Sequence, residues 1–342
     1  MIMTKATKIL YVGNNLSKYG NTPGTVETLG VLFEKENIEV IYAGHSLNKI
    51  KRLFEMCFSV IKNRNKIKYV LIDTYSTSAF WFAFSVGMIS RILDIKYIPI
   101  LHGGNLPERL KNSKYCSDLL FKNSFENVAV SGYLNYHFQK NGYKSIIIPN
   151  NIEIENYQFK KRNKISPNIL WVRSFHADYN PNLAIDVLEI VAKKYPDAKL
   201  CMVGPDKDGS MEVFKNYAKK KSLMGNIKIT GRLSKKDWHQ LSEQYDIFIN
   251  TTNYDNTPVS VLEAMALGLP VVTTSVGGIP FLLDHGKDAL LVDKNNKEQM
   301  AQAIITLLEN QDLADNITEN ALNKVSDFDW EVVKHKWINL LS

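Results

Sequence analysis

The chain has 342 residues, of which 45% are hydrophobic and 23% are charged. This length and composition allow two hydrophobic cores and exclude a disordered or fibrous protein. Cys57, Cys116 and Cys201 lie far apart, which argues against a disulfide framework or a zinc site and favours a reducing cytoplasm. Residues 1–13 lack the pattern of a cleaved signal and are expected to lead into a first strand.

In the first half of the chain, short apolar runs alternate with helical patterns. Helices are expected over 25–37 and around 47–62, and strands over 8–13, 38–44, 69–73, 96–101 and 128–131. The apolar run 79–90 is shorter than the roughly 20 residues of a membrane span, so we interpret it as a buried crossover helix. The alternation predicts a parallel sheet covered by helices.

The same pattern starts again after a polar stretch, 150–168, which we interpret as a linker. A helix is expected over 180–196, and strands over 168–172, 198–204, 226–231, 246–251 and 270–276. The chain is therefore predicted to form two Rossmann-like domains, 1–157 and 158–327.

The net charge of +7 lies entirely in the first half. Residues 1–157 hold 19 Lys and Arg against 12 Asp and Glu, whereas residues 158–342 hold 23 of each. Such a basic half suggests contact with phosphates, an acidic polymer or an anionic membrane.

The segment 47–68 carries seven of the basic residues and one acid, Glu55. Its apolar residues recur at helical spacing: Leu47, Ile50, Leu53, Phe54, Cys57 and Ile61. One interpretation is that this stripe packs on the sheet and the cations form a solvated face. The other is that the cations hold the protein on an anionic membrane, with at least part of the stripe still packed.

The stretch 254–278 predicts an anion site. Thr257 is a good N-cap and Pro258 suits the first helical position, so a helix is expected from 258 to about 267, ended by Gly268. The first free N–H groups would belong to Val259 and Ser260, at the carboxyl edge of a parallel sheet. A phosphate is the natural ligand there.

Two carboxylates, Asp255 and Glu263, lie eight positions apart around this helix start. Asp255 would lie near the phosphate, and Glu263 could accept hydrogen bonds from both hydroxyls of a ribose diol. The alternative is that Asp255 supports the turn and Glu263 faces solvent.

This stretch resembles the Glu-seven-residues-Glu signature of the family 4 glycosyltransferases, which have the GT-B fold. Further resemblances follow in the right order: 130–153 to the last segment of the N-domain, 229–252 to the base-binding loop, helix and strand, and 327–341 to the final helix. They imply two Rossmann-like domains facing across a cleft, with a C-terminal helix, about 328–342, that crosses back to the first domain.

The resemblance also implies a function: transfer of a sugar from a nucleotide-diphospho-sugar with retention of configuration, and no essential metal or cofactor. Glu263 takes the ribose role and Asp255 the sugar role, although the family usually has Glu there. The resemblance also places Gly231 in the base-binding loop. Phe281 stands where the family often has an acid.

Arg173 would lie at the carboxyl end of a strand, where its guanidinium could clamp a pyrophosphate through two hydrogen bonds. The family usually has a Lys about six residues further on, and Tyr179 stands there instead. Either another cation helps, or neutralisation of the phosphates depends more on Arg173. The alternative is an ordinary surface Arg.

The first domain offers Gly24, at the end of a long turn before a helix, with Thr25 as a possible cap. The resemblance implies that this loop lies beside the donor phosphates. His102 follows a strand and could hydrogen-bond a sugar hydroxyl, although a lone His is often structural.

The expected partners are a nucleotide-sugar donor and a glycan or lipid-linked acceptor, with no nucleic acid. Asp206 and Asp208 match the DxD pattern of a metal-binding motif, but a metal site is not expected there. The competing functions are a sugar-nucleotide epimerase of the same fold and a nucleotide-binding relic without transfer activity.

Overall fold

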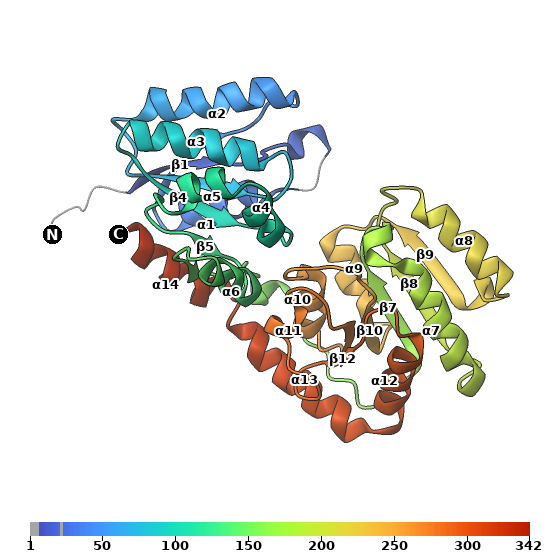
Figure 1. Ribbon diagram of the computed structural model, residues 1–342. Coiled ribbons are helices and arrows are strands. Elements are labelled where there is room, and N and C mark those ends of the chain that lie inside the picture. Colours follow the sequence, from blue (N-terminus) through green and yellow to red (C-terminus); the bar gives the residue numbers. More distant parts are fainter. Residues whose placement is uncertain (1–6, 21–22) are drawn as a thin grey trace. The chain divides into compact units, whose positions relative to one another are not determined.

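The computed structural model describes residues 7–20 and 23–342. The chain divides into two compact units (Figure 1). The first runs to Asn150 and includes Lys334–Ser342, and the second is Asn151–Val333. The division predicted from the sequence lies a few residues later in the chain, after residue 157.

The first unit contains a parallel sheet, which in the described residues has the order β2-β1-β3-β4-β5-β6. Its strands are β1 (Lys8–Val12), β2 (Glu39–Ala43), β3 (Tyr69–Thr74), β4 (Lys96–Leu101), β5 (Val128–Ala129) and β6 (Ile146–Ile147). The order reverses at β1, which lies between β2 and β3. β3 is buried along its whole length, as expected of a strand covered on both faces.

Helices connect these strands, and α2 and α3 lie side by side over the first sheet (Figure 1). The helices of this unit are α1 (Thr25–Lys35), α2 (Lys49–Asn63), α3 (Phe80–Ile92), α4 (Leu106–Asn112), α5 (Lys114–Phe121) and α6 (Gly132–Lys140). The apolar run 79–90 is the crossover helix α3, as predicted. No described helix is both long and apolar enough to cross a membrane.

The second unit contains a parallel sheet of order β12-β11-β10-β7-β8-β9. Its strands are β7 (Asn168–Val172), β8 (Lys199–Val203), β9 (Ile227–Gly231), β10 (Ile247–Asn250), β11 (Val271–Thr274) and β12 (Leu290–Val292). The order reverses at β7, which lies between β10 and β8. Ligands of such sheets bind at this reversal, beyond the carboxyl ends of the strands.

Two buried apolar clusters lie in this unit and hold its helices. One includes residues of α7 and α12, and the other includes most of α10. The helices are α7 (Pro181–Lys194), α8 (Ser210–Lys220), α9 (Lys235–Ser242), α10 (Val259–Ala266), α11 (Ile279–Leu282), α12 (Lys297–Glu309) and α13 (Gln311–Ser326). The last helix, α14 (Trp330–Leu341), begins in the second unit, and its residues from Lys334 onward belong to the first.

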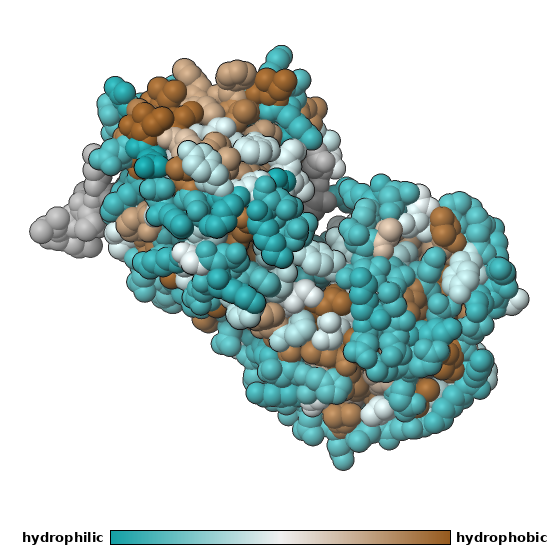
Figure 2. Space-filling view, in the orientation of Figure 1, coloured by the Kyte–Doolittle hydropathy of each residue, from teal (hydrophilic) through white to brown (hydrophobic). Residues whose placement is uncertain are grey.

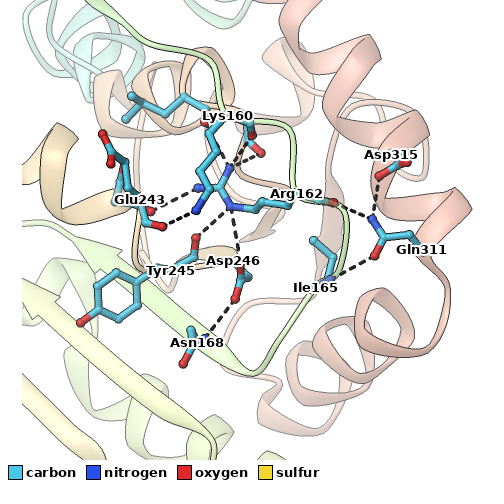
Figure 3. Close-up of polar contacts among 12 residues, drawn as sticks. Lys160, Arg162, Ile165, Asn168, Glu243, Tyr245, Asp246, Gln311 and Asp315 are labelled. Carbon is cyan, nitrogen blue, oxygen red and sulfur yellow. Dashed lines mark hydrogen bonds and ion pairs between the residues drawn. The ribbon is translucent and has the colours of Figure 1, made fainter.

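The interpretation of 150–168 as a linker is wrong for most of the stretch, because it is built into the second unit (Figure 3). The buried Arg162 donates hydrogen bonds to the carbonyls of Lys160, Ser242, Tyr245, Leu267 and Gly268. Burial lowers the pKa of Arg162 to about 10, although Asp246 opposes the shift. A polar sequence therefore supplies a buried side chain that is hydrogen-bonded to five backbone carbonyls of this unit.

Two strands were not expected from the sequence. β6 has two residues and β12 has three, and both lie at sheet edges. Runs this short carry no period that separates a strand from a loop.

Candidate functional site

The candidate site of the second unit lies where the order of its strands reverses. β7 leads directly into Arg173, and β10 leads into the loop 251–258 before α10. β7 and β10 are parallel neighbours, so their carboxyl ends meet at one edge of the sheet. The described structure therefore brings together the predicted residues that follow these two strands.

The start of α10 differs from the prediction by one residue. Pro258 is the N-cap and Val259 the first helical residue, so Thr257 does not cap the helix. Proline has no side-chain acceptor, and its extended backbone starts the helix instead. The hydroxyl oxygens of Thr257 and Ser260 are buried and have no hydrogen-bond partner within the described part of the chain.

A glycine pair fixes the loop that holds Asp255. A Cβ on Gly277 would lie 2.1 Å from the Asp255 carbonyl oxygen, and one on Gly278 would lie 2.0 Å from that of Asn256. Gly278 also donates its N–H to the Asp255 carbonyl at 2.9 Å. The two glycines after β11 thus allow a backbone approach that no other residue permits.

The Arg173 guanidinium forms an ion pair with the Asp255 carboxylate. It also lies over the ring of Tyr179, 4.6 Å from the ring centre. Burial lowers the pKa of Arg173, although Tyr179 and Glu263 oppose the shift. Nε of Arg173 is buried and has no hydrogen-bond partner among the described residues. With its side chain 17% exposed, Arg173 is not the ordinary surface residue of the alternative interpretation.

Glu263 is 4% exposed, so the interpretation that it faces solvent is wrong. Its Oε1 accepts a hydrogen bond from the Tyr157 hydroxyl at 3.0 Å and lies 2.8 Å from Nζ of Lys235. A carboxylate this buried is tolerated because it is paired and hydrogen-bonded. The Lys235 side chain is 70% exposed, so this cation can move without disturbing the core.

His239 of α9 lies beside Tyr157, the hydrogen-bond partner of Glu263. Its ring is 4.6 Å from the ring of Tyr157, measured between centres. Burial lowers the pKa of His239, and although Glu263 opposes this shift, Lys235 adds to it. No sequence pattern singles out His239, Tyr157 or Lys235.

Gly231 lies at the same edge, at the end of β9. Its φ of +71° is in the left-handed region, and an added Cβ would meet no atom within 4 Å. Its carbonyl accepts the N–H of Gly204 at 2.8 Å, and Gly204 in turn approaches the Arg173 carbonyl too closely for a Cβ. Gly231 thus supports the backbone next to Arg173 and faces open space.

The first unit holds His102 in a buried network. Nε2 of His102 lies 2.9 Å from Oδ1 of Asp73, and the Tyr11 hydroxyl donates to the same oxygen at 3.0 Å. The His102 ring stacks on Tyr75, with 5.3 Å between the ring centres. Burial, followed by the Asp73 charge, raises the pKa of Tyr11 well above its usual range. Asp73 was not predicted, although an acid in an otherwise apolar strand was the available signal.

Gly24 is the N-cap of α1, so Thr25 is the first helical residue and not the cap. The Gly24 N–H donates to the carboxylate of Glu27 at 2.8 Å. This amide is therefore engaged within the turn. A Cβ on Gly24 would lie 3.0 Å from the Asn14 carbonyl oxygen, so the turn packs closely at this point.

The Asp206 and Asp208 carboxylates serve the loop before α8. Asp206 accepts from the N–H of Gly209, and Asp208 accepts from those of Ser210 and Ala177. Within residues 7–20 and 23–342, no group of three or more His, Cys, Asp or Glu side chains is arranged to hold a metal ion.

The model of the family described as glycosyl transferases group 1 matches residues 153–324, which is half of the chain. The chain belongs to the group 1 glycosyl transferases. The matched range covers the second unit almost completely and includes Arg173, Asp255 and Glu263.

Relatives of this group 1 chain include uncharacterized glycosyltransferases. One from Haemophilus influenzae is 27% identical over 60% of this chain and 56% of its own length. One from Methanocaldococcus jannaschii is 26% identical over 73% of this chain and 70% of its own length. The chain thus spans little more than half the length of the first relative.

Solved structures confirm the predicted GT-B fold. HepE of Anabaena, in complex with UDP and glucose, has a TM-score of 0.78 at 18% identity, covering 98% of this chain and 99% of HepE. Sucrose-phosphate synthase of Thermosynechococcus elongatus has a TM-score of 0.77 at 14% identity, covering 98% of both chains. At these identities the likeness establishes the fold alone.

Proposed function

We propose that this protein transfers a sugar from a nucleotide-diphospho-sugar to a glycan or lipid-linked acceptor, with retention of configuration and without a metal ion. The observation that carries the proposal is a set of buried donors without partners. Nε of Arg173 and the hydroxyls of Thr257 and Ser260 come from elements whose ends meet at the reversal of the second sheet.

A diphosphate suits these donors. Buried donors without partners cost free energy, and an anion that accepts from them removes that cost. The first N–H groups of α10, on Val259 and Ser260, have no acceptor within the helix and add the positive end of its dipole. Such preorganised donors would also stabilise the charge that develops on the leaving diphosphate.

Glu263 is assigned to the ribose of the donor. Tyr157 and Lys235 both contact Oε1, and the hydrogen bond from Tyr157 holds the carboxylate in place. Oε2 is the oxygen that we assign to the ribose hydroxyls. Gly231 lies at the end of β9 and is assigned to the base or ribose, because an added Cβ there would meet no atom within 4 Å.

His102 and Asp255 are assigned to the sugar. When Nε2 of His102 donates to Asp73, Nδ1 becomes an acceptor for a sugar hydroxyl. Asp255 would accept from the donor sugar while Arg173 holds the diphosphate. Gly24 is assigned to the turn beside the phosphates, a role that its engaged N–H limits to close backbone approach.

The relatives support a nucleotide-sugar donor. Structures of HepE contain UDP, UDP with glucose, or UDP-glucose. Other relatives are described as D-inositol 3-phosphate glycosyltransferase and poly(ribitol-phosphate) alpha-N-acetylglucosaminyltransferase. Their acceptors differ, so the acceptor of this protein has to be found by experiment.

The test is a screen of the purified protein against nucleoside diphosphates and their sugars by calorimetry, followed by turnover with labelled donors. We expect binding of a nucleoside diphosphate that Arg173→Lys weakens, with a smaller effect on the bare nucleoside. Slow hydrolysis of the donor sugar would support transfer. Interconversion of the sugar would instead indicate an epimerase, and binding without any turnover would indicate a relic.

A further inference from the structure

Helix α2 exposes a row of large apolar side chains to solvent. Ile50 is 68% exposed, Phe54 70%, Phe58 62% and Ile61 47%. These four positions follow one another at intervals of three or four residues, so they lie on one face of the helix. We call these four residues the α2 ridge, and hydrophobic residues gather over α2 in the space-filling view (Figure 2).

The opposite face of α2 is the one that packs on the protein. Met56 and Val60 are buried there, and the buried Arg52 donates to the Ser46 carbonyl at 3.1 Å. The Asn48 side chain caps the helix by accepting from two of its N–H groups. The orientation of the α2 ridge is therefore fixed by contacts on the other side, and the helix does not need the ridge for its own packing.

The exposed ridge contradicts the interpretation that the whole apolar stripe of 47–68 packs on the sheet. Ile50, Phe54 and Ile61 belong to that stripe and face outward instead. The sequence carries apolar residues on both faces of α2, so periodicity alone could not decide which face is buried. Exposed apolar rows of this size are unusual on a protein surface that has no partner.

The charge around the ridge is positive. Lys49 and Lys51 are exposed at the start of α2, and Lys62, Arg64, Lys66 and Lys68 are exposed at its end and in the turn beyond. The single acid of the helix, Glu55, does not offset them on the outer face. Its carboxylate accepts hydrogen bonds from the N–H groups of residues 44–46.

The same bias extends over the whole unit. The first unit holds 21 Lys and Arg against 10 Asp and Glu, whereas the second holds 21 against 25. An apolar ridge with basic residues at both ends matches a surface that is apolar inside and negatively charged outside. An anionic bilayer is such a surface.

We propose that α2 docks the protein on an anionic phospholipid membrane. Ile50, Phe54, Phe58 and Ile61 enter the boundary between head groups and acyl chains, with the helix lying in the membrane plane. The six exposed basic residues contact the lipid phosphates. The proposal concerns the first unit and does not depend on the transfer activity proposed above.

The test uses flotation of the full chain with vesicles of phosphatidylcholine containing graded amounts of phosphatidylglycerol, at low and high salt. We expect binding that rises with the anionic lipid and falls with salt. The double variant Phe54→Ser/Phe58→Ser should lose about tenfold or more of the partition constant, since both rings would leave the apolar phase. Because both side chains are exposed, the variant should fold, which circular dichroism and melting would verify.

Two control variants separate this surface from general effects. Val213→Ser removes an apolar side chain that is 59% exposed on α8 of the second unit and should not change binding. Lys62, Arg64, Lys66 and Lys68 changed together to Gln should reduce binding. Lys207, Lys219, Lys220 and Lys228 changed to Gln, all exposed in the second unit, should leave it much less affected.

Three results would overturn the proposal: no flotation with anionic vesicles at low salt, equal binding to pure phosphatidylcholine, or loss of binding in the Val213 control to the same degree. A dimer that Phe54→Ser/Phe58→Ser converts to a monomer, without vesicle binding, would assign the α2 ridge to a second copy of the chain instead.

Discussion

Replacing Asp255 by Asn should strengthen the binding of a nucleoside diphosphate while it weakens sugar transfer. In the structure the Asp255 carboxylate forms an ion pair with the Arg173 guanidinium, which is the group that we expect to bind the diphosphate. A donor must therefore share or displace this ion pair. The Asn side chain keeps the shape and can still accept the N–H of Asn256, which Asp255 Oδ1 accepts at 2.8 Å.

The magnitude follows from the contact that is removed. A hydrogen bond to a charged group contributes about 1.5–3 kcal/mol, so freeing Arg173 should raise the affinity for UDP by roughly tenfold or more. The loss of a negative charge beside the diphosphate acts in the same direction. Transfer should fall, because Asp255 is assigned to the donor sugar.

Calorimetry with UDP and with uridine measures this effect, and a labelled-donor assay measures transfer. Uridine lacks the phosphates, so its affinity should be unchanged in Asp255→Asn. Asp178→Asn is the matched control, because the Asp178 side chain is 70% exposed and is not paired with Arg173. A folded Asp255→Asn protein that binds UDP no better than the wild type would refute the competition between Asp255 and the diphosphate.

Three further changes test other parts of the molecule. Glu263→Gln should weaken UDP binding by about tenfold in calorimetry, with little effect on 2′,3′-dideoxy-UDP, because the lost charge serves the ribose hydroxyls. Asp73→Asn should lower kcat by about tenfold and leave UDP affinity unchanged, since it acts through His102; an equal loss of UDP affinity would contradict this. Arg162→Met should lower the free energy of unfolding by about 3–5 kcal/mol in urea titrations, whereas the exposed Lys161→Met should have almost no effect.

The sequence predicted the fold because its strongest signals are local and periodic. Apolar runs such as 69–73 and 96–101 became β3 and β4, and the alternation with helices fixed a parallel sheet. The gathering of Arg173, Asp255 and Glu263 was also predictable, since residues that follow parallel strands share one sheet edge. Polar contacts between residues far apart in the sequence, such as Tyr157 with Glu263, could not be predicted because local periodicity contains no information about them.

The clearest errors of the predictions from sequence concern which side chains are buried. Arg162 lies in the polar stretch 150–168 that we interpret as a linker from the sequence, yet its five N–H donors suit a pocket formed by carbonyl groups. Ile50 and Phe54 show the opposite case, because these apolar residues of the predicted stripe are exposed. The polarity of a side chain predicts whether it prefers to be buried or exposed, but the tertiary structure determines its actual surroundings.

Tyr179 stands where the resemblance to the family predicts a Lys, so the proposed diphosphate site has one cation fewer than expected. The Tyr179 ring lies against the Arg173 guanidinium and orients it without adding charge. Arg173 and Lys235 are then matched by Asp255 and Glu263, so these four side chains are balanced before a donor arrives. A diphosphate would add negative charge to this balanced set, and we infer that Lys235, whose side chain is 70% exposed, can shift toward it while Tyr157 holds Glu263. With Tyr179 in place of a Lys, we therefore expect the neutralisation of a diphosphate to depend partly on Lys235, which the strand-end motif does not contain.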